Sequence, residues 1–406
     1  MSFNIALTGL TAANEGLSVT ANNLANVATV GFKGSRAEFA DLFASTNQGV
    51  SATAIGNGVQ VSEVAQQFTQ GNIETTGNNL DMAISGNGFF TVSNNGALSY
   101  TRNGQFQLDN AGNVVNDAGA RLQVYPPLAN GGFNTGGLAD LSLTTNQSAP
   151  QATSTAQITA NLPASAAQPP NAFNPTDANS YNNSTSLTVY DSLGAAHTGT
   201  LYFIKGATAN AWTTQLYVDG TAVGTPQALT YNNAGALTAP ANGNITFPAY
   251  TPATGAAAMN MVFNFSNTTQ YGDNFNVSAV QQNGFTTGKL TGISVDSTGV
   301  VQARFTNGRS INLGQVALAN FANPQGLQQL GNASWAATNA SGAAVAGVAG
   351  NSGFGSVESG SVEESNVDTT SALVDMITSQ RNFQANAQMI QTDNQITQTI
   401  INIRNG

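Results

Sequence analysis

Residues 3–27, FNIALTGLTAANEGLSVTANNLANV, place an apolar residue at every seventh position. The repeated residues are Phe3, Leu10, Leu17 and Leu24, and Leu7, Asn14 and Ala21 fill the places between them. This alternation of three- and four-residue steps predicts an amphipathic helix with the narrow apolar stripe of a coiled coil. A polar residue in the stripe lowers the stability of such a helix, so we expect it to need a partner.

The other end of the chain carries the same pattern. Four residues recur every seven positions and five more lie between them: Met376, Phe383, Ile390 and Thr397, then Leu373, Gln380, Ala387, Asn394 and Ile401. We predict that the two helices pair with each other or with copies from neighbouring molecules; a closed hairpin within one monomer is the alternative. Ten residues are expected to pack in this terminal assembly: Phe3, Leu7, Leu10, Leu17, Leu24, Leu373, Met376, Phe383, Ile390 and Ile401.

The long region between the helices has the signals of β-structure. Short β runs alternate with turn signals from Gly71 onward. Asn-Gly pairs predict tight turns at 95–96, 103–104 and 307–308. Asp-x-x-Gly runs at 109–112, 191–194 and 296–299 predict turns in which Asp caps the backbone and Gly takes a positive φ.

These patterns predict a multidomain fold with an N- and C-terminal α-helical coiled-coil domain and two nested all-β domains. The expected divisions are 1–32 with 364–406 for the helical domain, 33–70 for an irregular connector, 71–145 with 285–363 for an inner discontinuous β domain, and 146–284 for an inserted outer β domain. Asp368 is the expected N-cap of the last helix. Glu363 and Glu364 precede that helix, where acidic residues interact favourably with its dipole.

Composition narrows the class of protein. Charged residues make up 7% of the chain, so its surface must consist largely of Asn, Gln, Ser, Thr and Gly. A net charge of −10 with only ten Lys and Arg argues against a nucleic-acid partner. With no cysteine there are no disulfides or thiolate metal sites. We expect no cleaved signal peptide and no membrane insertion, because polar residues interrupt the N-terminal helix and no apolar run reaches about 18 residues.

The sequence offers little catalytic chemistry. The one histidine, His197, is expected to be a surface residue of a hairpin. Asp109, Asp191 and Asp296 are explained by their turns, and the glycines form no phosphate-binding motif. We therefore expect no catalytic residues, no metal, no cofactor and no enzyme. A secreted glycan hydrolase would need two carboxylates converging in a cleft. A secreted adhesin or surface-layer protein would leave the terminal heptads unexplained.

Several segments resemble a known family. Four segments and one further run are similar to signatures of the bacterial flagellar axial proteins, which form the rod, the hook and related segments: residues 22–33 (NNLANVATVGFK), 76–90 (TGNNLDMAISGNGFF), 100–106 (YTRNGQF), 365–368 (SNVD) and 376–386 (MITSQRNFQAN). About 140 inserted residues, which contain VYDSLG at 189–194, resemble the inserted domain of the hook-forming members, and LANFANPQGL at 318–327 resembles their return segment. The alternative is a long distal-rod member.

The resemblance implies a function and partners. It implies a structural subunit that self-assembles into a curved hollow tube, a flexible joint transmitting torque from rod to filament, with the terminal helices as its innermost layer. The implied partners are further copies in a homopolymer, a flagellar rod protein, a hook cap protein, a hook–filament junction protein and the flagellar type III export apparatus. The implied location is the extracellular flagellum.

Overall fold

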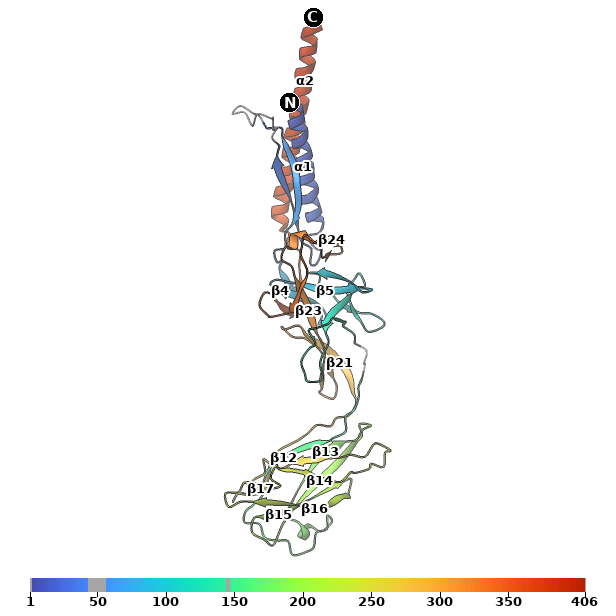
Figure 1. The fold of residues 1–406 in the computed structure, drawn as a ribbon, viewed down its shortest axis with the longest axis vertical. Helices are drawn as coiled ribbons and strands as arrows, with labels where there is room; N and C mark the ends of the chain where they lie inside the picture. The colour runs from blue at the N-terminus through green and yellow to red at the C-terminus, as the bar shows by residue number, and fades with distance from the viewer. Residues whose placement is uncertain (1, 43–55, 144–146, 406) are drawn as a thin grey trace. The chain divides into compact units, whose positions relative to one another are not determined.

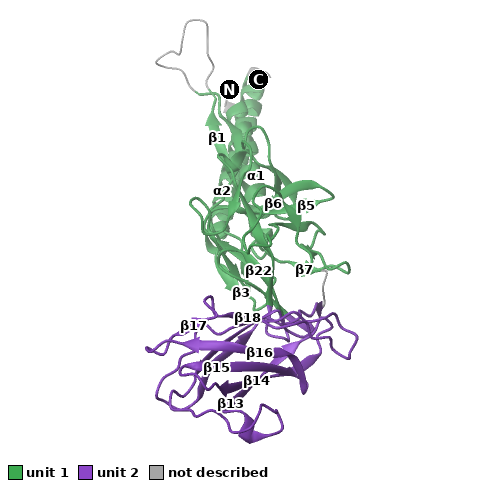
Figure 2. Ribbon diagram, turned by 60° about the horizontal axis from the view of Figure 1, so that its bottom comes forward, with its two compact units in different colours: residues 1–144, 292–304, 310–406 green, residues 145–291, 305–309 purple. Residues whose placement is uncertain are grey.

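The computed structural model describes residues 2–42, 56–143 and 147–405. The chain is mostly β-structure, with one long helix at each end (Figure 1). It divides into two compact units (Figure 2). Unit 1 contains residues 1–144, 292–304 and 310–406, and unit 2 contains residues 145–291 and 305–309. The four-part division remains a prediction, and its boundary at residues 145 and 146 lies outside the described residues.

The terminal helices belong to unit 1 and lie side by side (Figure 1). Helix α1 spans Ser2–Ala25 and α2 spans Thr369–Asn405. They run in opposite directions: Gly9 faces Asn386, and Gly16, seven residues later, faces Ser379, seven residues earlier. In this register the start of α1 lies opposite residue 393, so residues 394–405 of α2 continue past α1 (Figure 1).

A β-hairpin covers a second face of α1. Strands β1 (Ser35–Asp41) and β2 (Val59–Gln66) pair antiparallel and contact the helix. The ring of Phe39 approaches Gly16, and the Val59 amide donates to Thr8 Oγ1 at 3.4 Å. The expectation of an irregular connector over 33–70 is therefore wrong for these strands, because the short apolar alternation is stabilised by packing on α1. Residues 43–55 of the expected connector lie outside the described residues.

The rest of unit 1 is built around one large sheet. Its central path runs β22-β23-β9-β5-β6-β25-β24, and two small pairs, β27-β4 and β28-β3, accompany it. Phe89, Tyr100 and Trp335 form the core of an aromatic cluster that Phe68 joins edge-on. The elements are β3 (Ile73–Thr75), β4 (Met82–Ser85), β5 (Phe89–Asn94), β6 (Ala97–Thr101), β7 (Gln107–Leu108), β8 (Val114–Val115), β9 (Arg121–Tyr125), β10 (Ala139–Asp140), β22 (Val300–Phe305), β23 (Ser310–Asn320), η2 (Pro324–Gly326), β24 (Gln328–Gly331), β25 (Ser334–Ala336), β26 (Val345–Val348), β27 (Ser356–Ser359) and β28 (Ser361–Glu363).

Unit 2 contains two sheets with a shared core. The five-stranded sheet has the order β13-β14-β15-β16-β17 and the four-stranded sheet β18-β19-β12-β20. Phe203 and Trp212 of the first sheet are buried in one cluster with Ile158 and Phe263 of the second. The elements are β11 (Gln147–Ser148), β12 (Thr155–Asn161), η1 (Ala178–Ser180), β13 (Asn183–Tyr190), β14 (Ala196–Lys205), β15 (Ala211–Val218), β16 (Thr221–Tyr231), β17 (Leu237–Ala239), β18 (Asn244–Thr246), β19 (Val262–Asn264), β20 (Asn276–Gln282) and β21 (Gly288–Val295), whose last four residues belong to unit 1.

Most of the predicted turns are present. Asn95 and Gly96 both have positive φ, and Gly112, Gly194, Gly299 and Gly308 have it as well. The pair 103–104 was predicted wrongly, because neither residue has a positive φ. Gly104 is needed there for another reason. A Cβ at this position would lie 1.6 Å from the carbonyl oxygen of Met82, so only glycine allows the backbone at 104 to approach the backbone at 82.

Candidate assembly site at the terminal helices

The contact between α1 and α2 follows heptads whose register differs from the expected one. In α2 the buried and half-buried positions include 372, 376, 379, 383, 386, 390 and 393, an unbroken alternation of four- and three-residue steps. Met376, Phe383 and Ile390 are among them, as predicted. The intervening places fall one residue earlier than expected, at Ala372, Ser379 and Asn386. Of the intervening residues expected there, Ala387 is half-buried, whereas Leu373, Gln380 and Asn394 are exposed.

The same one-residue difference occurs in α1. Leu10, Leu17 and Leu24 are half-buried, but Leu7, Asn14 and Ala21 are exposed. Ala6, Ala13 and Thr20 take the intervening places instead, and the half-buried Val27 continues the spacing two residues past the end of α1. Small side chains and Gly9 allow the two helices to approach closely, which a large side chain on either helix would prevent. The heptads were recognised in the sequence from large apolar side chains, so these small residues were not predicted to lie in the contact.

The predicted assembly residues therefore fall into two groups. Six of them are half-buried beside the helix contact: Leu10, Leu17, Leu24, Met376, Phe383 and Ile390. The other four are 41–44% exposed: Phe3, Leu7, Leu373 and Ile401. Further large apolar residues of α2 are exposed with them: Val374, Ile377, Met389, Ile396, Ile400 and Ile403. The helix pair thus presents much apolar surface that this chain alone leaves uncovered.

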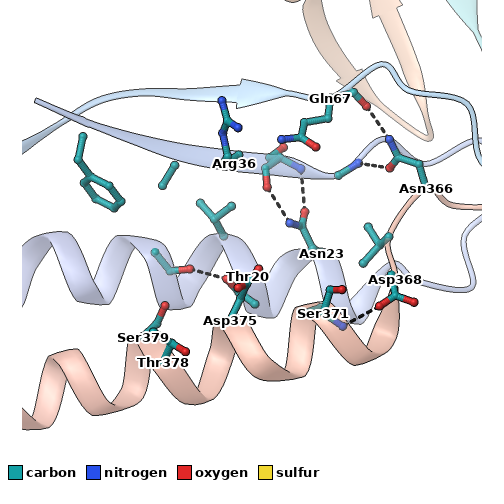
Figure 3. Close-up of a pocket in the computed structure, with 18 residues that line it drawn as sticks. Thr20, Asn23, Arg36, Gln67, Asn366, Asp368, Ser371, Asp375, Thr378 and Ser379 are labelled. Atoms are coloured by element: carbon teal, nitrogen blue, oxygen red, sulfur yellow. Dashed lines mark hydrogen bonds between the residues drawn. The ribbon is translucent and has the colours of Figure 1, made fainter.

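Two asparagines fix the hairpin and the helices to one another (Figure 3). The side chain of Asn23 bonds Ser35 twice, donating to its carbonyl at 2.7 Å and accepting from its amide at 2.9 Å. Asn366 accepts from the Gly34 amide at 2.8 Å and donates to the Gln67 carbonyl at 2.7 Å. Both residues lie within the resembling segments. They border a groove of about 430 Å³ that is lined by α1, α2 and the hairpin.

Asp368 begins α2 as predicted. Its Oδ1 accepts from the Ser371 amide at 2.7 Å, the bond of an N-cap (Figure 3). This bond lowers the pKa of Asp368 below its usual 3.8, because an amide donor favours the charged carboxylate.

A buried ion cluster lies close to this junction. Glu363 accepts from Lys33 Nζ at 2.6 Å and from Arg102 Nη1 at 2.9 Å, and the side chains of Lys33, Glu363 and Arg102 are 0%, 0% and 5% exposed. Burial lowers the pKa of Lys33, and the charge of Glu363 opposes that shift. The expectation that Glu363 acts on the helix dipole is wrong, since its carboxylate faces two cations. The cluster joins the segments 22–33 and 100–106 to the strand before α2.

His197 also differs from its expectation. It is 7% exposed and buried in unit 2, because Asp191 and Asp219 lie on either side of its ring. Asp191 nevertheless has the predicted turn role, accepting from the Leu193 and Ala195 amides at 2.9 Å. Asp109 and Asp296 cap their turns in the same way. Within the described ranges no three or more His, Asp or Glu side chains gather as a metal site would require.

Sequence models of four flagellar families match separate parts of the chain in order, and leave residues 34–82 and 286–357 unmatched. The flagella basal body rod protein model matches residues 3–33, and the flagellar hook protein FlgE/F/G D1 domain matches 83–165. The flagellar basal body protein FlaE D2 domain matches 161–285, and the flagellar basal body rod FlgEFG protein C-terminal model matches 358–403.

Relatives that match over the whole chain identify the family more narrowly than these separate models do. The flagellar hook protein FlgE of Salmonella typhimurium is 40% identical over 416 residues, covering 100% of both chains. The chain belongs to the flagellar hook protein family. The FlgE proteins of Escherichia coli K12 and Treponema pallidum are 40% and 31% identical, over 100% and 96% of each chain. The hook protein FlgE2 of Helicobacter pylori covers 70% of this chain and 99% of its own with a TM-score of 0.53 and 14% identity, a likeness of fold.

Membership of the flagellar hook protein family establishes the role of the chain and its location in the flagellum. It is a structural subunit that polymerises in the bacterial flagellar hook, and the relatives favour the hook over the distal rod. The family is one of structural proteins. Among the described residues, neither helix is apolar enough over its length to cross a membrane.

Proposed function

We propose that this hook subunit polymerises through its terminal helices into a curved hollow tube, and that the tube is a flexible joint passing torque from rod to filament. The observation that supports the proposal best is the apolar surface of α2. Every described side chain from 394 to 403 is exposed, including Ile396 at 53% and Ile400 at 61%. An isolated helix end of this kind is marginal in water, so neighbouring copies are its natural cover.

The helix pair is the part of unit 1 that assembly would order most. Its seam is narrow, with a serine and an asparagine at the positions facing α1. The ten residues predicted to pack in the assembly keep that role in this proposal. Half-buried residues such as Leu17 would complete their burial against a neighbour, and exposed residues such as Leu7, at 44% exposure, would have more surface left to bury.

The small share of charged residues, 7% of the chain, supports the proposal that the tube is flexible. Each contact between subunits of a bent rotating tube must lengthen and shorten once per turn. Short polar side chains exchange direct and water-bridged hydrogen bonds at little cost in free energy, whereas fixed ion pairs would favour discrete registers. Replacing clustered surface Asn and Gln by Glu/Lys pairs should therefore stiffen the tube. Unchanged curvature and bending in electron micrographs would contradict this part of the proposal.

We also propose the other flagellar partners that the resemblance implies. A rod protein at one end, a hook cap protein during growth and a hook–filament junction protein at the other end would contact the same polymer. The subunit would reach the cell exterior through the flagellar type III export apparatus without a cleaved signal peptide. Export of the full chain at unchanged mass, measured in culture supernatants, tests this last point.

Electron microscopy of the purified chain in ammonium sulfate tests assembly directly. The full chain should form curved hollow tubes, and a chain lacking residues 1–32 and 364–406 should stay monomeric. Straight rigid tubes would favour the distal-rod alternative. Monomers from both chains under all conditions would contradict assembly driven by the terminal helices.

A further inference from the structure

The only histidine of the chain lies at a junction of three loops in unit 2. His197 is the second residue of β14 and pairs with Val189 of β13. Asp191 follows β13 directly, and Asp219 forms the two-residue turn between β15 and β16. The fold thus brings two carboxylates, separated by 28 residues, to opposite sides of one imidazole ring.

Both nitrogens of that ring face a carboxylate oxygen. His197 Nδ1 lies 2.5 Å from Asp219 Oδ2, and Nε2 lies 3.2 Å from Asp191 Oδ2. The other oxygen of each carboxylate already accepts backbone amides, from Thr198 for Asp219 and from Leu193 and Ala195 for Asp191. An ionised carboxylate only accepts, so both of these bonds are satisfied together only when both ring nitrogens carry a proton and the ring is an imidazolium.

A third segment is held by the same groups. Thr254 donates its hydroxyl to Asp191 Oδ2 at 2.8 Å, and the Ala257 amide donates to Ser192 Oγ at 2.9 Å. Tyr250 packs edge-on against the His197 ring, with 6.1 Å between ring centroids. The segment closes on itself where Tyr250 and Met259 bridge. Hydrogen bonds thus attach the loop over 250–259 to the β13–β14 turn, and Tyr250 contacts the ring of His197, which lies between the Asp191 and Asp219 carboxylates of the two turns.

We propose that Asp191, His197 and Asp219 form a pH-dependent clasp, which holds loop 250–259 against the two turns while His197 carries both ring protons and releases it when one is lost. Loss of a proton leaves a ring lone pair facing a carboxylate oxygen, which is repulsive. The titratable groups facing His197 are Asp191 from the β13–β14 turn, Asp219 from the β15–β16 turn and Tyr250 from the loop. Below, the name clasp refers to Asp191, His197 and Asp219.

The pKa values give the pH range in which the clasp is closed. Burial by itself lowers the pKa of His197, but the hydrogen bonds that its ring donates to Asp219 and Asp191 outweigh burial and raise the pKa above 6.5. The stabilisation from His197 is therefore full below pH 6.5 and is lost as the pH rises through the raised value. Burial raises the pKa of Asp191, but bonds from Thr254 and its other donors lower it to about 2. The Asp191 contribution is present above pH 3.8 and is lost as the pH falls toward about 2.

Because the chain has a single histidine, its titration can be followed without assignment. The full chain is labelled at the histidine ring and kept dilute enough to stay monomeric, and its ring signals are recorded by NMR from pH 5 to 9. Hydrogen exchange of loop 250–259 is measured over the same range and corrected for the intrinsic rise of about tenfold per pH unit. We expect one titration above pH 6.5 and faster loop exchange over the same interval.

Three variants separate the clasp from general stability. Asp219→Asn removes one charge while Asp191 keeps its bonds, so the His197 pKa should fall and the exchange step should move with it. His197→Gln should exchange quickly at every pH, with no step. Asp273→Asn, a control at an exposed carboxylate of unit 2, should behave as the parent chain. A His197 pKa at or below 6.5, or the same exchange step in His197→Gln, would overturn the proposal.

Discussion

Gly9 of α1 faces Asn386 of α2 so closely that a Cβ at position 9 would lie 2.8 Å from Asn386 Oδ1. One heptad further along, the same contact is looser, because a Cβ at Gly16 would lie 3.6 Å from Ser379 Oγ. The two glycines therefore occupy equivalent places in the antiparallel pair but differ in the space around them. Both glycines lower the intrinsic stability of the helix, but only Gly9 is needed for the close contact with α2.

Alanine at the two positions should have different effects. Ala is favoured over Gly in a helix by about 0.8–1.0 kcal/mol, so Gly16→Ala should stabilise the helix pair by about that amount. Gly9→Ala should gain clearly less, because Asn386 must move and its bond to the Asn382 carbonyl, 2.9 Å long, is disturbed. Hydrogen exchange of α1 and α2 in the monomer measures both. Equal stabilisation by both substitutions would contradict the close contact at Gly9.

The buried ion cluster should matter far more than a surface pair. Glu363→Gln leaves Lys33 and Arg102 buried without an anion, and breaking a buried pair in this way costs about 3–5 kcal/mol. Glu38→Gln is the control, since its pair with Arg36 is 42% and 66% exposed and is worth less than about 1 kcal/mol. Urea unfolding of unit 1 measures both. A small effect of Glu363→Gln would mean that Lys33 and Arg102 find other partners.

The cap of α2 should depend on pH. The pKa of Asp368 is lowered, so its stabilisation of the helix is present above pH 3.8 and is lost as the pH falls through the lower folded-state value. Asp368→Ala should speed exchange of the Ser371 amide at neutral pH, whereas Asp368→Asn, which keeps an acceptor oxygen, should preserve most protection without the pH dependence. If the Asp368→Ala chain retained full protection, the N-cap would not stabilise the first turn.

The sequence predicted the features that rest on local chemistry. Heptad spacing identified both helices and residues such as Phe383, because large apolar side chains dominate the pattern. The Asp-x-x-Gly turns were found because the capping bonds of Asp191 join residues that are close in sequence. These signals need no knowledge of the tertiary structure.

Features that rest on distant partners were missed. Ala372 and Ser379 line the helix contact because α1 approaches there, and small size alone does not show this in one sequence. His197 seemed a surface residue because Asp219, 22 residues away, reaches it only through the β15–β16 turn. Glu363 was assigned to the helix dipole because Lys33 is 330 residues away in the chain.

The exposed end of α2 gives a test of polymerisation that leaves the monomer fold unchanged. Ile396 and Ile400 lie beyond the last residue opposite α1, so Ile396→Asn with Ile400→Asn should leave unfolding of the monomer unaltered. Burying one such side chain contributes about 1.5–3 kcal/mol, and about 1.4 kcal/mol is a factor of ten in an equilibrium constant. We therefore expect the critical concentration for tube formation to rise at least tenfold, measured by sedimentation in ammonium sulfate.

The matched control changes two polar residues on the same helix end. Gln395→Ser with Thr399→Ser alters the same stretch but keeps both isoleucines, and the serine hydroxyl can keep the bond that Thr399 donates to the carbonyl of residue 395. This variant should assemble at nearly the parent concentration, because its exposed apolar residues are intact. If the isoleucine variant assembled as readily as this control, residues 394–403 would be facing water in the tube, and the apolar cover from neighbouring copies would have to lie nearer Leu7 and Leu373.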